Sequence, residues 1–102
     1  MSEIPIDKQR KDAEMLLQVV SEASGYSVDD IKHATKSYGI NVARGVACVV
    51  SKELQIIPRI FGEVLERTRC NVVNISKHYR GYLSTKDKAT VNLYEKVKQM
   101  LP

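Results

Sequence analysis

Apolar residues recur at helical spacing along most of this chain. No stretch alternates polar and apolar residues between turn signals, as a half-buried strand would. The pattern therefore predicts an all-helical protein. A first helix is expected from about Asp7 to Ala23, with Gly25 ending it. Ser27 has the position of an N-cap for a short second helix that ends near residues 37–39.

The middle of the chain holds the most apolar helical segment. Asn41 is predicted to cap this third helix, and apolar residues then surround nearly its whole circumference up to Leu54. We therefore expect it to be the central and most buried helix. Gly45 costs about 1 kcal/mol in helix propensity relative to Ala. A glycine there leaves room for another helix to approach closely.

Residues 58–83 have the pattern of a helix-turn-helix. Pro58 suits the first turn of a fourth helix that runs to about Glu66, residues 67–70 form the turn, and Asn71 caps a fifth helix. One face of the fifth helix is apolar and the opposite face is polar. A helix-turn-helix needs this division, because its second helix packs on its own domain while offering donors to base edges.

A last amphipathic helix is expected at about 86–101, which makes the 102 residues one compact all-α domain of five to six helices. The net charge of +4 is unevenly spread. Residues 1–66 carry eight Lys and Arg against ten Asp and Glu, whereas residues 67–102 carry eight against two. This concentration of basic charge favours a polyanion partner. A solvated basic surface is the alternative.

Several function classes are disfavoured. No apolar run approaches the roughly 20 residues of a membrane helix, and the charged N-terminus lacks a signal core. Cys48 and Cys70 form no CxxC motif, so a cytoplasmic protein with reduced thiols is expected. His33 and His78 lack partners at metal-ligand spacing, and there is no Gly-rich phosphate loop. We therefore expect no enzyme, no metal site and no cofactor.

The candidate DNA-binding residues lie in the helix-turn-helix and just before it. Arg67 and Arg69 flank the positive N-terminal end of the fifth helix, where a phosphate is favoured. Asn can pair with adenine, and Lys can donate to guanine or phosphate. A cation on the central helix is either a structural pair or a phosphate clamp. The complete candidate set is Lys36, Arg44, Arg67, Thr68, Arg69, Asn71, Asn74, Lys77 and His78.

Within residues 16–83, three stretches resemble, in the same order, the C-terminal DNA-binding domain of the bacterial replication initiator DnaA. They are VVSEASGYSVDDI, NVARGVACVVSKEL and IIPRIFGEVLERTRCNVVNISKHYR. The third is similar to the family's Leu-Pro-Glu-Ile-Gly helix, its Gly-Arg-Asp-His turn and its recognition helix, which begins Thr-Thr/Ser-Val. The residue type is kept at Pro58, Ile60, Arg67 and Val72.

This resemblance implies a DnaA C-terminal, Trp-repressor-like fold that binds double-stranded DNA, with Arg44 and Arg67 as DNA contacts. The family's Asp-His is replaced here by Thr68-Arg69, its Thr pair by Cys70-Asn71, and a later His by Asn74. The resemblance therefore implies which positions read bases, but the residues at those positions differ from those of the family. With no room for the initiator's ATPase domain, the chain is expected to be a stand-alone bacterial or phage regulator of replication or transcription.

Two other interpretations stay open at this point. The same fold can serve as a protein-interaction module that forms a homodimer or binds a protein partner through its last helix. The apolar residues for that contact are Leu93, Tyr94, Val97 and Leu101. A ligand-gated repressor is the third interpretation, by analogy with the Trp repressor alone.

Overall fold

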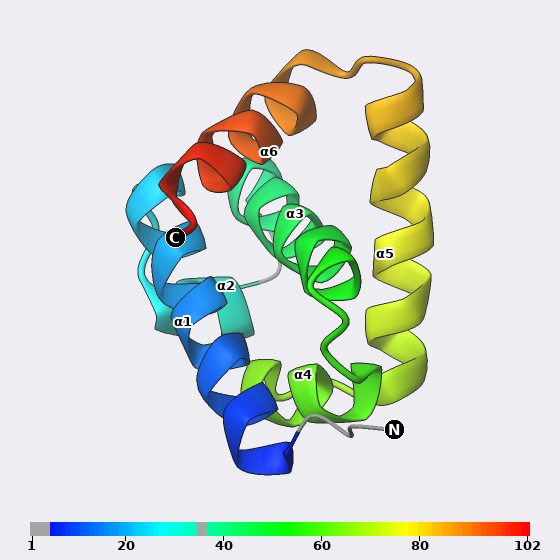
Figure 1. Ribbon diagram of the computed structural model, residues 1–102. Coiled ribbons are helices and arrows are strands. Elements are labelled where there is room, and N and C mark those ends of the chain that lie inside the picture. The colour runs from blue at the N-terminus through cyan, green and yellow to red at the C-terminus, as the bar shows by residue number, and fades with distance from the viewer. Residues whose placement is uncertain (1–4, 35–36) are drawn as a thin grey trace.

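Six helices make up residues 5–34 and 37–102, the part of the chain that the computed structural model describes, and this part contains no strand. The prediction of an all-helical protein is confirmed. In Figure 1, α3 lies between α1 on one side and α5 on the other, while α4 and α6 lie at opposite ends. The helices are α1 (Ile6–Ser24), α2 (Val28–His33), α3 (Tyr38–Glu53), α4 (Pro58–Leu65), α5 (Arg69–Ser84) and α6 (Lys88–Met100).

α3 is the centre of the core. All its residues from Val42 to Ser51 are buried, because α3 packs against each of the other five helices. The apolar stripe of α1 and the side chains of Phe61 and Leu65 on α4 complete the core. The α3–α4 loop is fixed to α1 by Gln9, whose side chain donates to Gln55 O at 3.1 Å and accepts from Ile57 N at 2.9 Å. The expectation that the third helix is the most buried is confirmed.

Two predicted boundaries around α3 are wrong. α2 ends at His33 rather than near residues 37–39, because Ala34 adopts an extended conformation. α3 begins at Tyr38, and its N-cap is Ser37 rather than Asn41. The Ser37 hydroxyl accepts the amide of Ile40 at 3.3 Å, which is the N-cap bond that satisfies an orphan helix donor. Both caps were chemically suitable, and only the chain path selected between them.

α5 also begins earlier than predicted. Thr68, not Asn71, is its N-cap, and the Thr68 hydroxyl accepts from Asn71 N at 3.1 Å. The turn between α4 and α5 therefore comprises residues 66–68. The short linker before α6 similarly ends at Asp87, whose carboxylate accepts from Thr90 N at 3.2 Å and caps α6.

The apolar stripe of α6 packs on the domain's own core. Val97 is fully buried, and Leu93, Tyr94 and Leu101 pack against the buried cluster. Tyr94 and Lys98 also donate to the carboxylate of Glu53 at the end of α3. The face expected to contact a protein partner is thus covered by this chain itself. Across the two described ranges, no helix is both long and apolar enough to cross a membrane.

α3 and α5 are in close contact at Gly45. A Cβ built on Gly45 would lie 2.3 Å from ring atoms of Tyr79, which lies over that glycine. Such a separation is impossible for real atoms, so any side chain at this position would push α5 away from α3. The expected close approach at Gly45 is confirmed, and it fixes where α5 sits.

Gly45→Ala and Gly81→Ala form a matched pair of helical substitutions. At Gly81, a Cβ would meet nothing within 4 Å, so alanine should raise the free energy of unfolding by about 0.5–1 kcal/mol through helix propensity. At Gly45 the collision with Tyr79 should outweigh that gain and lower stability by about 1–3 kcal/mol. Urea unfolding followed by circular dichroism measures both. Equal effects of the two substitutions would contradict the packing described here.

Candidate nucleic-acid interface

The turn between α4 and α5 folds tightly back onto α4. Arg67 N donates to Gly62 O at 2.7 Å, and a Cβ on Gly62 would lie only 2.6 Å from the carbonyl oxygen of Arg67. Glycine at position 62 is therefore required by the turn's backbone. Glu66 ends α4 in the left-handed conformation, with φ of 62°. These features join α4 and α5 through a compact turn of three residues.

Two arginines bind the carbonyl end of α2. Arg44, on α3, donates to Ile31 O at 2.7 Å, to Asn41 Oδ1 at 2.8 Å and to the carbonyl of Ala34. Arg67, in the helix-turn-helix turn, donates to Lys32 O at 2.9 Å. The last carbonyls of a helix lack intrahelical partners and carry partial negative charge. The guanidinium groups donate hydrogen bonds to these carbonyls and bring positive charge to them. They thereby join α2, α3 and the turn.

Arg44 is a structural residue rather than an exposed phosphate contact. It is only 5% exposed, and burial together with the nearby charge of Arg67 lowers its pKa below the usual value. Its hydrogen bonds all go to groups of this chain. Of the two roles considered for a cation on the central helix, the geometry supports the structural one, although its partners are carbonyls and an amide instead of a carboxylate.

Ion pairs also hold the turn against α2. Glu66 lies 3.0 Å from His33 Nε2 and 3.5 Å from Lys32 Nζ, and His33 Nδ1 lies 3.2 Å from Asp29. The hydrogen bond to Glu66 is the main cause that raises the pKa of His33, and the same bond lowers the pKa of Glu66. The turn that precedes α5 is therefore held by charge as well as by backbone contacts.

α5 buries one side and exposes the other. Val72 and Ser76 are buried, and Ile75 and Tyr79 pack against the core. At about 100° of rotation per residue, the side farthest from Val72 carries Cys70, Asn74, Lys77 and Gly81, which are all exposed. This exposed face is polar and contains no acidic residue.

The predicted site residues divide into three groups. Arg69, Asn74, Lys77 and His78 are exposed on α5. A second group holds the turn and α2 in place, namely Thr68, Arg67 and Arg44. Lys36 lies outside the described residues. Asn71 is half-buried at the flank of α5, and its Oδ1 has no hydrogen-bond partner among the described residues.

Two further exposed residues of α5 were missed by the sequence analysis. Arg80 follows Arg69 by eleven residues, about three turns, so both lie along the same edge of the helix. On the opposite edge the ring of Tyr82 contacts His78, with a hydroxyl-to-Nε2 distance of 3.1 Å and a centroid separation of 5.1 Å. The spacing of Arg69 and Arg80 was readable in the sequence once the helix was extended to Ser84.

The cations of α5 have no acidic partners in the described part of the chain. The ion pairs found there join α1 to itself and to α4, α2 to itself and to Glu66, and α6 to α3. Arg69, Lys77 and Arg80 are in none of them. Among these same residues, no group of three or more His, Cys, Asp or Glu side chains could hold a metal ion.

Comparison with known proteins gives no assignment. No protein-family model matches the chain, and no curated protein matches it.

The structural role of Arg44 predicts a specific effect of Arg44→Lys. Lysine keeps the charge but cannot reproduce the fork that reaches three oxygens. The substitution should lower the free energy of unfolding by about 2–4 kcal/mol. Chemical unfolding measures this, with the exposed Arg59→Lys as control, which should change stability by less than about 0.5 kcal/mol. A stability loss no larger than that of the control would show that the bonds of Arg44 contribute little.

The His33–Glu66 pair predicts a pH window for the stability of the turn. The raised pKa of His33 means that its contribution is complete below its usual value of 6.5 and is lost as the pH rises through the folded-state pKa. The lowered pKa of Glu66 means that its contribution is complete above 4.5 and is lost as the pH falls through the folded-state pKa. His33→Gln should therefore lower the melting temperature more at about pH 5.5 than at about pH 8.5.

The Glu66→Gln variant tests whether the pH dependence comes from the His33–Glu66 pair. In that background, the pH dependence of the His33→Gln effect should shrink, because only Asp29 remains to favour the charged imidazole. The same pH dependence with and without the Glu66 carboxylate would show that another group causes it.

Proposed function

We propose that this protein binds double-stranded DNA by inserting α5 into the major groove. The observation that carries the proposal is the exposed face of α5, the second helix of a tight helix-turn-helix. That face is polar, has no acidic residue, and bears cations without partners among the described residues. A helix-turn-helix presents its second helix to base edges in this way.

The proposed contacts follow from position on α5. Asn74, on the outward side, can make a bidentate pair with adenine, and Lys77 beside it can donate to guanine or to phosphate. Arg69 and Arg80, which are exposed along one edge of α5, contact phosphates of one strand in this proposal. His78 and Tyr82, on the opposite edge, present polar atoms to the other strand. Arg67 and Thr68 act by holding the turn rather than by direct contact.

The charge distribution supports the same proposal. Most acidic residues lie on α1, α2 and α4, whereas α5 and the linker to α6 carry Arg69, Lys77, Arg80 and Lys86 against Asp87. In Figure 1 α5 lies on the opposite side of α3 from α1. The resemblance to the DnaA C-terminal domain is a further support, and we propose a DnaA-like, Trp-repressor-like helix-turn-helix as the fold type. A role in replication or transcription is the corresponding proposal for its cellular function.

DNA affinity should fall steeply with salt. Each cation that neutralises one phosphate contributes about −0.9 to the slope of log K against log salt. Fluorescence anisotropy with a labelled random-sequence duplex of a little over two helical turns, between about 50 and 200 mM salt, measures the slope. Arg69→Ala and Arg80→Ala should each weaken binding and make the slope shallower by about 0.9, the contribution of one phosphate contact. No binding at the lowest salt would overturn the proposal.

Two control variants separate charge from position. Lys11→Ala removes an exposed cation of α1, on the other side of the domain, and should leave the affinity unchanged. Asn74→Ala should barely change binding to random DNA but should reduce discrimination within a preferred site found by selection, by about 1–3 kcal/mol per base pair read. Equal losses from Lys11→Ala and Arg69→Ala would indicate unspecific attraction rather than an interface on α5.

A further inference from the structure

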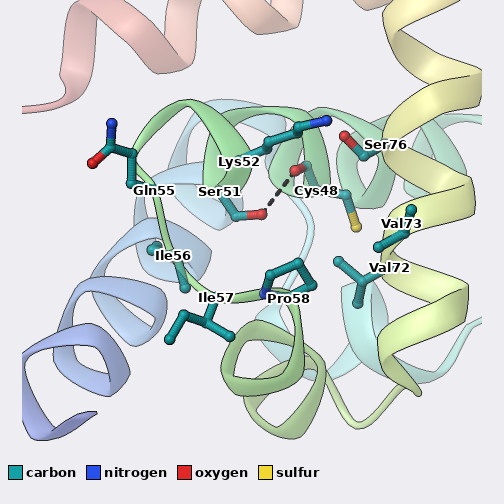
Figure 2. Close-up of a pocket in the computed structure, with 10 residues that line it drawn as sticks. All are labelled: Cys48, Ser51, Lys52, Gln55, Ile56, Ile57, Pro58, Val72, Val73 and Ser76. Atoms are coloured by element: carbon teal, nitrogen blue, oxygen red, sulfur yellow. Dashed lines mark hydrogen bonds between the residues drawn. The ribbon is translucent and has the colours of Figure 1, made fainter. Parts of the chain in front are cut away.

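A pocket lies between α5 and the end of α3, next to the edge of α5 that carries Arg69. Its volume is about 340 Å³, and it is an open pocket bordered by the end of α3, the α3–α4 loop and the first half of α5 (Figure 2). This volume is within the range of pockets that hold small molecules. The apolar part of its wall is formed by Ile56, Ile57, Pro58, Val72 and Val73.

The wall also contains a buried hydroxyl that lacks a partner. Of the two serines that line the pocket, Ser51 donates to Cys48 O at 2.7 Å, whereas Ser76 Oγ has no hydrogen bond among the described residues although Ser76 is only 4% exposed. An unpaired buried polar group is costly and is rare in folded proteins. A Ser hydroxyl can turn between staggered rotamers, so a polar group brought into the pocket can pair with it.

The charge at the pocket favours an anion. Lys52 is the charged residue of its lining, which contains no Asp or Glu. In the view of Figure 2, the Lys52 ammonium and the Ser76 hydroxyl lie at the same edge of the pocket. A neighbouring hollow shares Ile57, Pro58 and Val73 with the pocket. Its other lining residues are Arg69, Cys70 and Asn74, so it too contains no carboxylate. Neither cation takes part in an ion pair with the described residues.

We propose that this pocket binds a small monocarboxylate with an aromatic or branched apolar body. The apolar body packs against Val72, Val73 and Ile57. The carboxylate accepts from the Lys52 ammonium and from the Ser76 hydroxyl, which thereby gains its missing partner. This ligand site goes beyond the proposed DNA interface and does not depend on it, because its wall and its charge exist without DNA.

The test uses the whole protein and 3-phenylpropionate as probe, without DNA. Amide shifts in a ¹H–¹⁵N correlation spectrum should move in residues 52–57 and 72–76 and saturate with a Kd on the order of 1 mM or tighter. The neutral analogue 3-phenylpropan-1-ol should bind at least about threefold more weakly, because it lacks the charge-assisted bonds. No saturable shifts, shifts scattered over the surface, or equal affinity for the two compounds would overturn the proposal.

Matched variants distinguish a binding role from a structural one. Ser76→Ala removes the unpaired hydroxyl, so it should raise the melting temperature and at the same time weaken binding of 3-phenylpropionate by about threefold or more. Ser84→Ala, at an exposed position of the same helix, should leave the affinity unchanged. Lys52→Met should abolish the preference for the acid over the alcohol, whereas Lys11→Met should preserve it. Unaltered affinity in both Ser76→Ala and Lys52→Met would contradict the assignment.

Discussion

The carbonyl end of α2 is the constraint on which the rest of the structure depends. α2 has six residues, too few for an isolated helix to be stable. Its end is stabilised by guanidinium groups that arrive from α3 and from the turn before α5. Because Arg44 and Arg67 bind neighbouring carbonyls, the path of α2 fixes the distance between the central helix and the helix-turn-helix. The proposed reading helix is thus positioned by residues that do not lie on it.

Two glycines then set the position of α5 in the remaining directions. Gly62 allows the turn to fold onto α4, and Gly45 allows the ring of Tyr79 to pack directly on α3. Both are steric requirements, so they tolerate no side chain without a movement of α5. The consequence is a helix held firmly on one side, whose opposite side is exposed among the described residues. A rigid support of this kind suits a surface that must recognise a shaped partner.

The proposed base-reading residues and the pocket lie on different sides of α5, with the edge that carries Arg69 between them. Asn74 and Lys77 face outward, whereas Val72, Val73 and Ser76 line the pocket beside α3. Both sites are free of acidic residues, most of which lie on α1, α2 and α4. An anion is therefore the favoured partner on each side of α5, a nucleic-acid backbone on one and a small carboxylate on the other. The second site differs from the first in having a buried hydroxyl, that of Ser76, without a hydrogen-bond partner among the described residues.

Helical periodicity and composition were enough to predict much of this protein. The apolar repeats predicted α1, α4 and α6 closely and identified α3 as the most buried helix. Pro58 marked the start of α4, and Gly45 marked the close contact with α5, because these features are local or depend on a missing side chain. The spacing of Arg69 and Arg80 could also have been used, since it needs only the helix repeat. The charge asymmetry was likewise a property of the sequence alone.

Tertiary structure decided what each polar residue does. Ser37 and Asn41, and likewise Thr68 and Asn71, are all suitable caps, and only the path of the chain chose between them. Arg44 was equally compatible with a phosphate contact, but α2 and the residue that caps it supplied two carbonyl acceptors beside it, and Arg44 is buried there. The apolar stripe of α6 was covered by α1 and α3, and Ser76 was enclosed without a partner. Local sequence determines which bonds a side chain is able to make, whereas the partners that reach it come from segments far away in the chain.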